Sequence, residues 1–93
     1  MFSWDTRKAL KNYRKHGVPF EEASTVFSDP EALDWEDLEH PAAERRWKRL
    51  GLSTQGRTLL VVYTLRRLGN GIETIRIISA RQASRRERQA YAR

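Results

Sequence analysis

The run TLLVVYTL, within the segment from Arg57 to Arg67, is apolar at successive positions and not only at alternate ones. Successive side chains of an extended strand point to opposite faces of its sheet, so this run predicts a strand that is covered on both sides. Such a strand belongs in the middle of a sheet. A chain of 93 residues can enclose one modest core, and we therefore expect a small single domain, residues 1–93, around this strand.

Tight turns flank the central strand. The turn STQG precedes it, and LGNG, which contains the Asn-Gly pair typical of hairpins, follows it. The strands on either side, predicted at residues 44–52 and 72–80, must therefore run antiparallel to it. Two shorter strands are predicted at residues 2–4 and 32–35, which makes a sheet of four or five strands.

Three helices complete the predicted fold. Apolar residues at helical spacing cover residues 6–16, after Asp5 as N-cap and before Gly17 as C-cap. A second helix is predicted to begin at Pro19 and to stop at an Asp-Pro pair. A closing helix is predicted from Arg81 to the end of the chain. The predicted order is β-α-α-β-β-β-β-α, an α+β fold with an antiparallel sheet flanked by helices.

The charge of the chain is unevenly distributed. Residues 1–43 hold five Lys/Arg against nine Asp/Glu, a balance of −4, whereas residues 44–93 hold thirteen against three, a balance of +10. The net charge of +6 therefore lies in the second half, which favours a polyanionic partner. This balance narrows the class of partner but not the activity.

Several classes of protein are disfavoured by what the sequence lacks. It has no cysteine for a disulfide framework or a thiolate zinc site, and its two histidines are far apart, so we expect no metal and no cofactor. No apolar run approaches the length of a membrane span, and no signal peptide opens the chain. We expect a soluble cytoplasmic protein with no membrane partner.

The basic residues of the second half are predicted to converge beside the closing helix. Arg76 lies within a run of isoleucines, on the strand face that does not carry Ile75 and Ile77. Arg46 and Lys48 occupy comparable positions on the strand that begins at Glu44. An arginine in such a strand needs a partner. A buried ion pair with Glu44 or Glu73 is one reading of Arg76, and an anionic ligand is the other.

The closing helix offers a second set of cations. If it begins at Arg81, then Arg81, Arg85 and Arg88 form one line along it, and Arg86 points elsewhere. Such a line is either a solvated helix face or one wall of a site for a negatively charged ligand.

Several segments together resemble the BrnT family of ribonuclease toxins of type II toxin–antitoxin systems. They are FSWD, KNYRKHG, GVPFEEASTVFSDP, an acidic stretch that ends in His40, ERRW, GRTLLVVYT and IRIISARQASRRERQAY. Each piece is weakly diagnostic, but their order and spacing are specific and cover nearly the whole chain. The chain departs from the family pattern at Arg45, where relatives commonly have a second acidic residue.

The resemblance implies a RelE-like fold and a toxin that cleaves RNA and inhibits translation. It also implies a hetero-oligomer with a cognate BrnA-type antitoxin, a ribbon-helix-helix protein through which the complex would reach promoter DNA and repress transcription. Alternatives are a nucleic-acid-binding module without chemistry and a structural subunit of a transcription-repressing complex.

RNA cleavage without a metal uses the 2′-hydroxyl of the RNA as nucleophile, so the protein must stabilise charge on the phosphate and help to move protons. A guanidinium group suits the first task. We expect this role for Arg76 and Arg81, followed by Arg46 and Arg57, and proton transfer by Glu44 or His40. Backbone contacts with RNA are expected from Lys48, Arg85, Arg86 and Arg88. The three arginines of the closing helix could equally bind an acidic antitoxin segment, and the sequence leaves both uses open.

Overall fold

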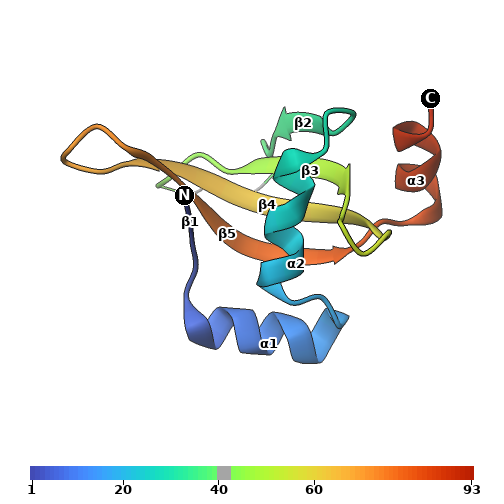
Figure 1. Ribbon diagram of the computed structural model, residues 1–93, viewed down its shortest axis with the longest axis horizontal. Coiled ribbons are helices and arrows are strands. Elements are labelled where there is room, and N and C mark those ends of the chain that lie inside the picture. Colours follow the sequence, from blue (N-terminus) through green and yellow to red (C-terminus); the bar gives the residue numbers. More distant parts are fainter. Residues whose placement is uncertain (40–42) are drawn as a thin grey trace.

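The computed structural model describes residues 1–39 and 43–93 (Figure 1). The described part contains five strands, three α-helices and one short 3₁₀-helix, in the predicted order. The elements are β1 (Phe2–Ser3), α1 (Thr6–His16), α2 (Phe20–Ser24), the 3₁₀-helix η1 (Thr25–Ser28), β2 (Leu33–Glu36), β3 (Trp47–Leu52), β4 (Thr58–Arg67), β5 (Glu73–Gln82) and α3 (Arg85–Tyr91). The predicted α+β class is confirmed.

The five strands form one sheet in the order β1-β5-β4-β3-β2. The apolar strand β4 is central, as its sequence predicts, and it pairs antiparallel with β3 and β5. The prediction of a wholly antiparallel sheet is wrong, because β1 runs parallel to β5. Hairpin turns dictate the direction of β3, β4 and β5, whereas β1 reaches the sheet edge from the far end of the chain and is free of that constraint.

The closing helix is shorter than predicted. β5 continues to Gln82, so Arg81 lies in a strand, and α3 begins only at Arg85. Ser84 is the N-cap of α3, where its hydroxyl accepts a hydrogen bond from the amide of Glu87, and the Glu87 carboxylate accepts one from the amide of Ser84. This capping box sets the start of the helix. The predicted line of Arg81, Arg85 and Arg88 along one helix is therefore wrong.

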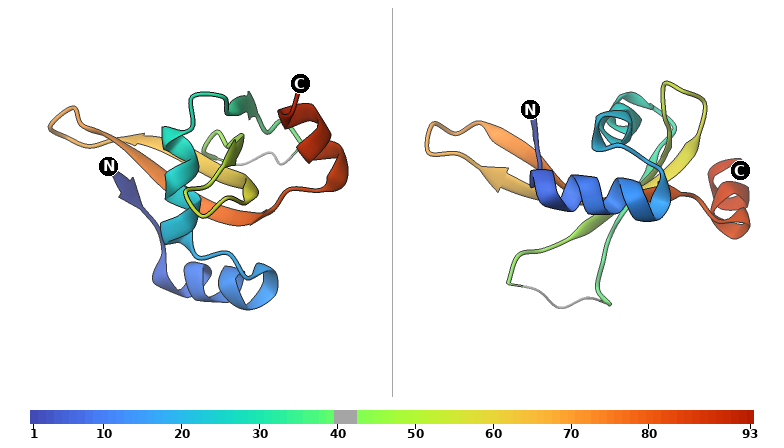
Figure 2. Two further views of the ribbon diagram at one scale, coloured as in Figure 1. Left: turned by 45° about the vertical axis from the view of Figure 1, so that its right-hand side comes forward. Right: turned by 90° about the horizontal axis from the view of Figure 1, so that it is seen from below.

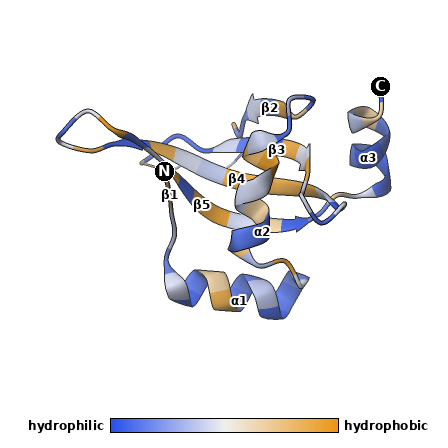
Figure 3. Cartoon of the chain, in the orientation of Figure 1, coloured by the Kyte–Doolittle hydropathy of each residue, from blue (hydrophilic) through white to orange (hydrophobic). Residues whose placement is uncertain are grey.

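Helices α1 and α2 enclose the main core against one face of the sheet (Figure 2). Hydropathic colouring shows the apolar positions concentrated in the central strands and on parts of these helices (Figure 3). The buried residues of this core are Val18, Phe20, Ala23 and Val26 from the helical layer and Leu59, Val61, Ile77 and Ala80 from β4 and β5. We call this side of the sheet the helix-covered face.

Helix α3 packs on the opposite face at one end of the sheet. There Leu50, Leu60 and Ala83 form a second small core, against which Tyr91 packs. The Tyr91 hydroxyl also donates a hydrogen bond to the carboxylate of Asp29, which lies just after η1. No helix among the described residues is both long enough and apolar enough to cross a membrane.

The pairing of β4 with β5 contains one irregularity. Val62 is opposite Ser79, but Tyr63 is opposite Ile77, so Ile78 is an extra residue in β5. An extra residue of this kind is a β-bulge, which shifts the alternation of side chains along its strand. Arg76 is opposite Thr64, and Arg81 is opposite Leu60. Arg76 and Arg81 are five positions apart and would face opposite sides of a regular strand, yet the bulge leaves both on the face that carries α3.

Candidate functional site: a cationic pocket on the open sheet face

A pocket of about 240 Å³ opens on the sheet face opposite the main core. Its walls come from α1, from the segment before β3, and from β4 and β5. The lining residues are Lys8, Ala43, Glu44, Arg46, Thr64, Arg66, Arg76 and Ile78. Four of them are cations and one is a carboxylate, and we call this site the cationic pocket.

Strand alternation explains why these residues meet. Thr64 and Arg66 are two positions apart on β4 and therefore share a face. Arg76 is directly opposite Thr64 on β5, which places it on the same face. The sequence predicted that Arg76, Arg46 and Lys48 converge beside the closing helix. Arg76 and Arg46 do line one pocket, but Lys48 and the residues of α3 are not in its described lining.

Glu44 is held by Arg66. The Arg66 Nε and Nη2 atoms donate to the two carboxylate oxygens of Glu44 at 2.9 and 3.0 Å. The hydrogen bond from Arg66 lowers the pKa of Glu44, burial opposes this effect, and the charges of Arg66, Arg76 and Arg46 lower the pKa further. Glu44 is therefore ionised at neutral pH and a weak proton acceptor.

Arg76 and Arg46 are half-buried without a carboxylate partner. Among the described residues, neither side chain makes an ion pair or a hydrogen bond, and the reading of Arg76 as one half of a buried ion pair with Glu44 or Glu73 is not supported. The positive charge of Arg76 acts on the pocket, because it contributes to the lowered pKa of Glu44. Both guanidinium groups are thus available to an anionic ligand.

A buried hydroxyl group also belongs to the pocket. Thr64 lines it, is 1% exposed, and its Oγ1 atom has no hydrogen-bond partner within the described chain. A buried hydroxyl without a partner is costly for folding. The Thr64 hydroxyl is thus a donor in the wall of the cationic pocket that no described group of the chain uses.

Lys8 is a pocket residue that the sequence analysis did not select. It lies on α1, in the half of the chain whose charge balance is negative. The signal that could have revealed it is local, because Lys8, Lys11 and Lys15 recur at spacings of three and four, which places them along one side of a helix.

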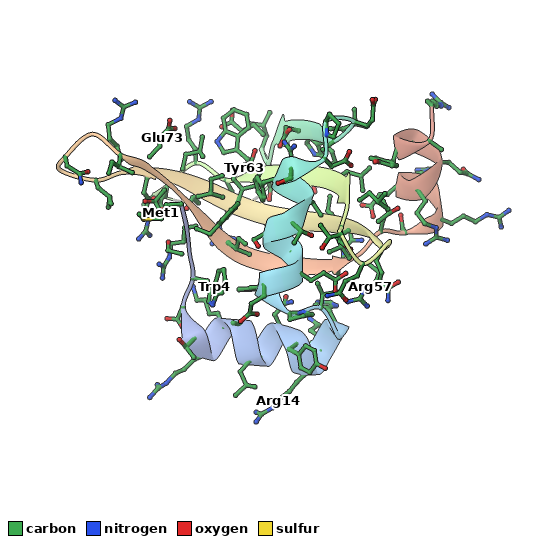
Figure 4. All side chains as sticks on the ribbon, viewed as in Figure 1. Met1, Trp4, Arg14, Arg57, Tyr63 and Glu73 are labelled. Atoms are coloured by element: carbon green, nitrogen blue, oxygen red, sulfur yellow. The ribbon has the colours of Figure 1, made fainter. Side chains whose placement is uncertain are left out.

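Arg57 lies elsewhere, beside α2 and the turn between β3 and β4 (Figure 4). It makes two hydrogen bonds with the carboxylate of Glu22, one of them from Nε at 2.9 Å, and a third with the carbonyl of Gly17 at 3.2 Å. Glu22 is buried and also accepts from the Ser53 hydroxyl at 2.7 Å. The structure therefore does not bring Arg57 together with Arg76, and its contacts secure the helices to the sheet.

Arg81 is also outside the lining of the cationic pocket. Its Nη1 and Nη2 atoms donate to the Glu87 carboxylate at 2.8 and 2.9 Å. These hydrogen bonds from Arg81, opposed by burial and assisted by the amide of Ser84, lower the pKa of Glu87 to about 2. Arg81 thus joins the end of β5 to α3.

The residues expected to bind the RNA backbone are dispersed. Lys48 is half-buried on β3, opposite Val62, on the same face as the pocket but not in its lining. Arg85 and Arg86 are exposed on α3, and Arg88 donates to the carbonyl of Ala83 at 2.8 Å. His40 lies outside the described residues.

Arg45, the departure from the family pattern, is oriented away from the cationic pocket lining. It makes a two-point ion pair with Glu36 at 2.7 and 2.9 Å, and its guanidinium group lies 5.1 Å from the ring centre of Trp47. These contacts join the segment before β3 to β2.

The fold and the lining of the pocket define a class: a small α+β protein with a cationic pocket on the open face of its sheet. Comparison with family models matches residues 4–87 to the ribonuclease toxin, BrnT, of type II toxin–antitoxin systems. The chain belongs to this family, whose toxins have an antitoxin partner.

Comparison with solved structures supports the same fold. The chain is similar to the crystal structure of the Brucella abortus ribonuclease toxin, BrnT, with a TM-score of 0.63 and 23% sequence identity. The match covers 91% of this chain and 99% of the Brucella chain. Comparison with curated protein sequences gives no significant match.

Proposed function

We propose that the chain is a metal-independent endoribonuclease that cleaves RNA in the cationic pocket and thereby inhibits translation. Membership of the ribonuclease toxin family supports the reaction class. The observation that carries the location is the pair of half-buried, unpaired guanidinium groups of Arg76 and Arg46 beside the buried hydroxyl of Thr64. All three groups can donate hydrogen bonds to a phosphate, and none of them donates to a described group of the protein.

In the proposed reaction, the 2′-oxygen of one nucleotide attacks the adjacent phosphorus. The bond from phosphorus to the 5′-oxygen breaks, and the products are a 2′,3′-cyclic phosphate and a 5′-hydroxyl group. Negative charge builds on the non-bridging oxygens as the 2′-oxygen adds. Arg76 and Arg46 stabilise that charge, and Thr64 donates one further hydrogen bond. Because these donors are held in place before the reaction, they need little rearrangement.

Two protons must move, one from the 2′-hydroxyl and one to the leaving oxygen. Glu44 is the carboxylate of the pocket, and its lowered pKa keeps it ionised but makes it a weak base. Its hydrogen bonds to Arg66 orient it across the pocket. His40 stays a sequence-based candidate for proton transfer. We therefore assign most of the rate enhancement to charge stabilisation.

Metal independence is supported by the chemistry of the lining residues. Divalent cations in phosphoryl-transfer enzymes are commonly held by carboxylates. The described lining of the cationic pocket offers a single carboxylate, which already accepts two hydrogen bonds from Arg66, and four cations surround it. This environment repels a metal ion and attracts a phosphate.

The proposed partner is a BrnA-type ribbon-helix-helix antitoxin that neutralises the toxin in a hetero-oligomer. Through this antitoxin the complex would bind promoter DNA and repress transcription. The exposed arginines Arg85 and Arg86 on α3 suit contact with an acidic antitoxin segment.

The test is cleavage of purified RNA in excess EDTA by the wild type, Arg76→Ala, Arg76→Lys and Arg81→Ala, compared at equal folded fraction. We expect Arg76→Ala to lower the cleavage rate by about 10² to 10³, the usual effect of removing one pre-placed donor to developing charge. Lysine keeps the charge but not the planar pair of donors, so Arg76→Lys should restore only part of the rate. Arg81→Ala should lower the rate by less than about tenfold, since Arg81 lies outside the pocket.

Equal cleavage by the wild type and Arg76→Ala would remove the cationic pocket as the active site. Binding of RNA without cleavage by the wild type would favour a nucleic-acid-binding module. A requirement for added metal ions would overturn metal independence while leaving the site itself in place.

A further inference from the structure

A second groove adjoins the cationic pocket along α1. It has a volume of about 210 Å³ and lies between α1 and the bulge of β5. Its lining residues are Lys8, Lys11, Asn12, Lys15, His16, Ile78 and Ser79. Lys8 and Ile78 also line the cationic pocket, so the two sites are continuous. We call this second site the α1 groove.

The lining of the α1 groove carries an excess of positive charge. Lys8, Lys11 and Lys15 are exposed, and no ion pair involving them occurs among the described residues. The described lining of the groove contains no acidic residue. The carboxylate of Asp5 is near Lys8, since the charge of Lys8 contributes to the lowered pKa of Asp5. No such effect is found for Lys11 or Lys15 in the described part of the chain, and a row of ammonium groups of this kind creates a local field that attracts a polyanion.

The polar groups in the groove favour recognition of a backbone over recognition of bases. The amide of Asn12 is buried and bonds to the backbone of Ala80 and Val18, so it is not free to read a ligand. The other polar groups of the lining are the three lysines, the imidazole of His16 and the hydroxyl of Ser79. Ammonium groups contact phosphates as point charges and carry little sequence information.

We propose that the RNA strand whose phosphate occupies the cationic pocket continues along the α1 groove, with Lys11 and Lys15 contacting the phosphates of neighbouring nucleotides. The identity of the ligand as RNA rests on the proposed function. Lys15 is seven positions after Lys8, about 10 Å along a helix. A stacked strand advances about 3.4 Å per nucleotide, so more than one phosphate can lie beside this row.

The groove suits RNA better than a protein segment. The centres of protein interfaces are apolar and depleted in charge, and lysine is under-represented there. Ile78 is the single aliphatic residue in the described lining of the α1 groove. The apolar surface of α1 lies elsewhere, around Leu10 and Tyr13.

The experiment measures binding of a short single-stranded RNA with 2′-O-methyl riboses, which cannot be cleaved by its own 2′-hydroxyl. Binding is followed by fluorescence anisotropy over a range of salt concentrations for the wild type and Lys11→Ala/Lys15→Ala. Each phosphate contact in a single strand contributes about 0.7 to the slope of log K against log salt. Loss of two contacts should therefore make the slope shallower by about 1.4.

The matched control is Arg7→Ala/Arg14→Ala, which removes two cations from the same helix outside the groove. Arg14 points away from the sheet (Figure 4). We expect this control to change the slope by less than half as much as the lysine pair does. Equal slopes for the two double variants, or an unchanged slope for Lys11→Ala/Lys15→Ala, would overturn the proposal.

The readout separates this proposal from the proposed function. If the wild type cleaves unmodified RNA but the Lys11→Ala/Lys15→Ala substitutions leave the salt slope of binding unchanged, the groove assignment fails and the ribonuclease assignment stands. If these substitutions make the slope shallower although the wild type does not cleave RNA, the groove assignment stands and the ribonuclease assignment fails. If the lysine variant keeps the wild-type RNA slope but loses affinity for a polyglutamate peptide, the groove docks acidic protein and the proposal is overturned.

Discussion

The side chain of Asn12 hydrogen-bonds to both backbone groups of Ala80. Its Oδ1 atom accepts from the Ala80 amide at 3.1 Å, and its Nδ2 atom donates to the Ala80 carbonyl at 2.8 Å and to the Val18 carbonyl at 3.2 Å. Strand β1 pairs with β5 only at Ile75 and Arg76. Beyond that point, the amide of Asn12 takes the place of a neighbouring strand at the edge of β5 and holds α1 against it.

Replacement of Asn12 should destabilise the fold. Asn12→Ala leaves buried backbone groups without partners, and we expect a loss of about 2–4 kcal/mol in the free energy of unfolding. Asn12→Asp keeps an acceptor for the Ala80 amide but places a carboxylate against two carbonyl oxygens, so it should cost at least as much at neutral pH. Urea denaturation measures both effects. Stability of the aspartate variant equal to wild type would contradict this role.

Thr64→Val should separate activity from stability. Valine has nearly the same shape and removes the buried hydroxyl that has no described partner. We expect unchanged or slightly increased thermal stability, by up to about 1 kcal/mol, because an unsatisfied polar group is removed. RNA cleavage should fall about tenfold if the hydroxyl donates to the phosphate.

Thr74→Val is the matched control for Thr64→Val. Thr74 is 5% exposed, its hydroxyl also lacks a partner in the described chain, and it is not among the residues that line the cationic pocket. It should show the same change in stability with unchanged cleavage. A similar loss of cleavage in both variants would mean that sheet packing, and not a phosphate contact, explains the effect at Thr64.

Arg57→Ala should act on stability. It removes the guanidinium partner of Glu22, whose side chain is 1% exposed. The hydrogen bonds from Arg57, opposed by burial and assisted by Ser53, lower the pKa of Glu22. An ionised carboxylate left without its partner typically costs about 3–5 kcal/mol. Arg57→Ala/Glu22→Gln should recover part of this loss, and cleavage per folded molecule should stay near wild type. A large fall in that normalised rate would restore Arg57 to the site.

Glu87→Gln should destabilise the protein in a pH-dependent way. Arg81 lowers the pKa of Glu87 to about 2, below its ordinary value of 4.5. The stabilisation is therefore complete above about pH 4.5 and is lost as the pH falls towards 2. Because Arg81 is 40% exposed, we discount the effect for solvent screening to about 1–2 kcal/mol at pH 7.

Glutamine is a sharp test of this ion pair because it can still complete the capping box of α3. The difference in unfolding free energy between the wild type and Glu87→Gln should shrink between pH 4.5 and pH 2. A difference that is constant over this range would show that the charge of Glu87 is not responsible.

The fold was predictable wherever neighbouring residues dictate it. Asp5 and Gly17 cap α1 as expected, since a cap depends on a few adjacent groups. The central position of β4 follows from its own apolar run. The parallel pairing of β1 was not predictable, because it joins residues separated by most of the chain. The start of α3 was missed although its signal is local, since the Ser84 to Glu87 capping box was read as part of a longer helix.

The candidate site was predictable for Arg76, whose direction is decided by strand alternation. Arg46 was also selected, although the strand predicted at residues 44–52 begins only at Trp47 and Arg46 lies just before it. The site was not predictable for Arg57, whose partner Glu22 lies 35 positions earlier in the chain. The sequence-based prediction of the site missed Lys8, because a charge balance summed over half of the chain does not reveal that one side of one helix is basic. Packing of α1 against β5 is what brings Lys8 to the pocket.

The single extra residue in β5 affects how this chain can be aligned with its relatives. Up to Ile77 the odd-numbered side chains of β5 face the main core, and after Ile78 the even-numbered side chains, such as that of Ala80, face it. A relative whose last strand is regular can be matched correctly only with a one-residue gap near Ile78. An ungapped alignment would equate core positions with surface positions over one half of the strand, and it would transfer functional assignments to the wrong arginine.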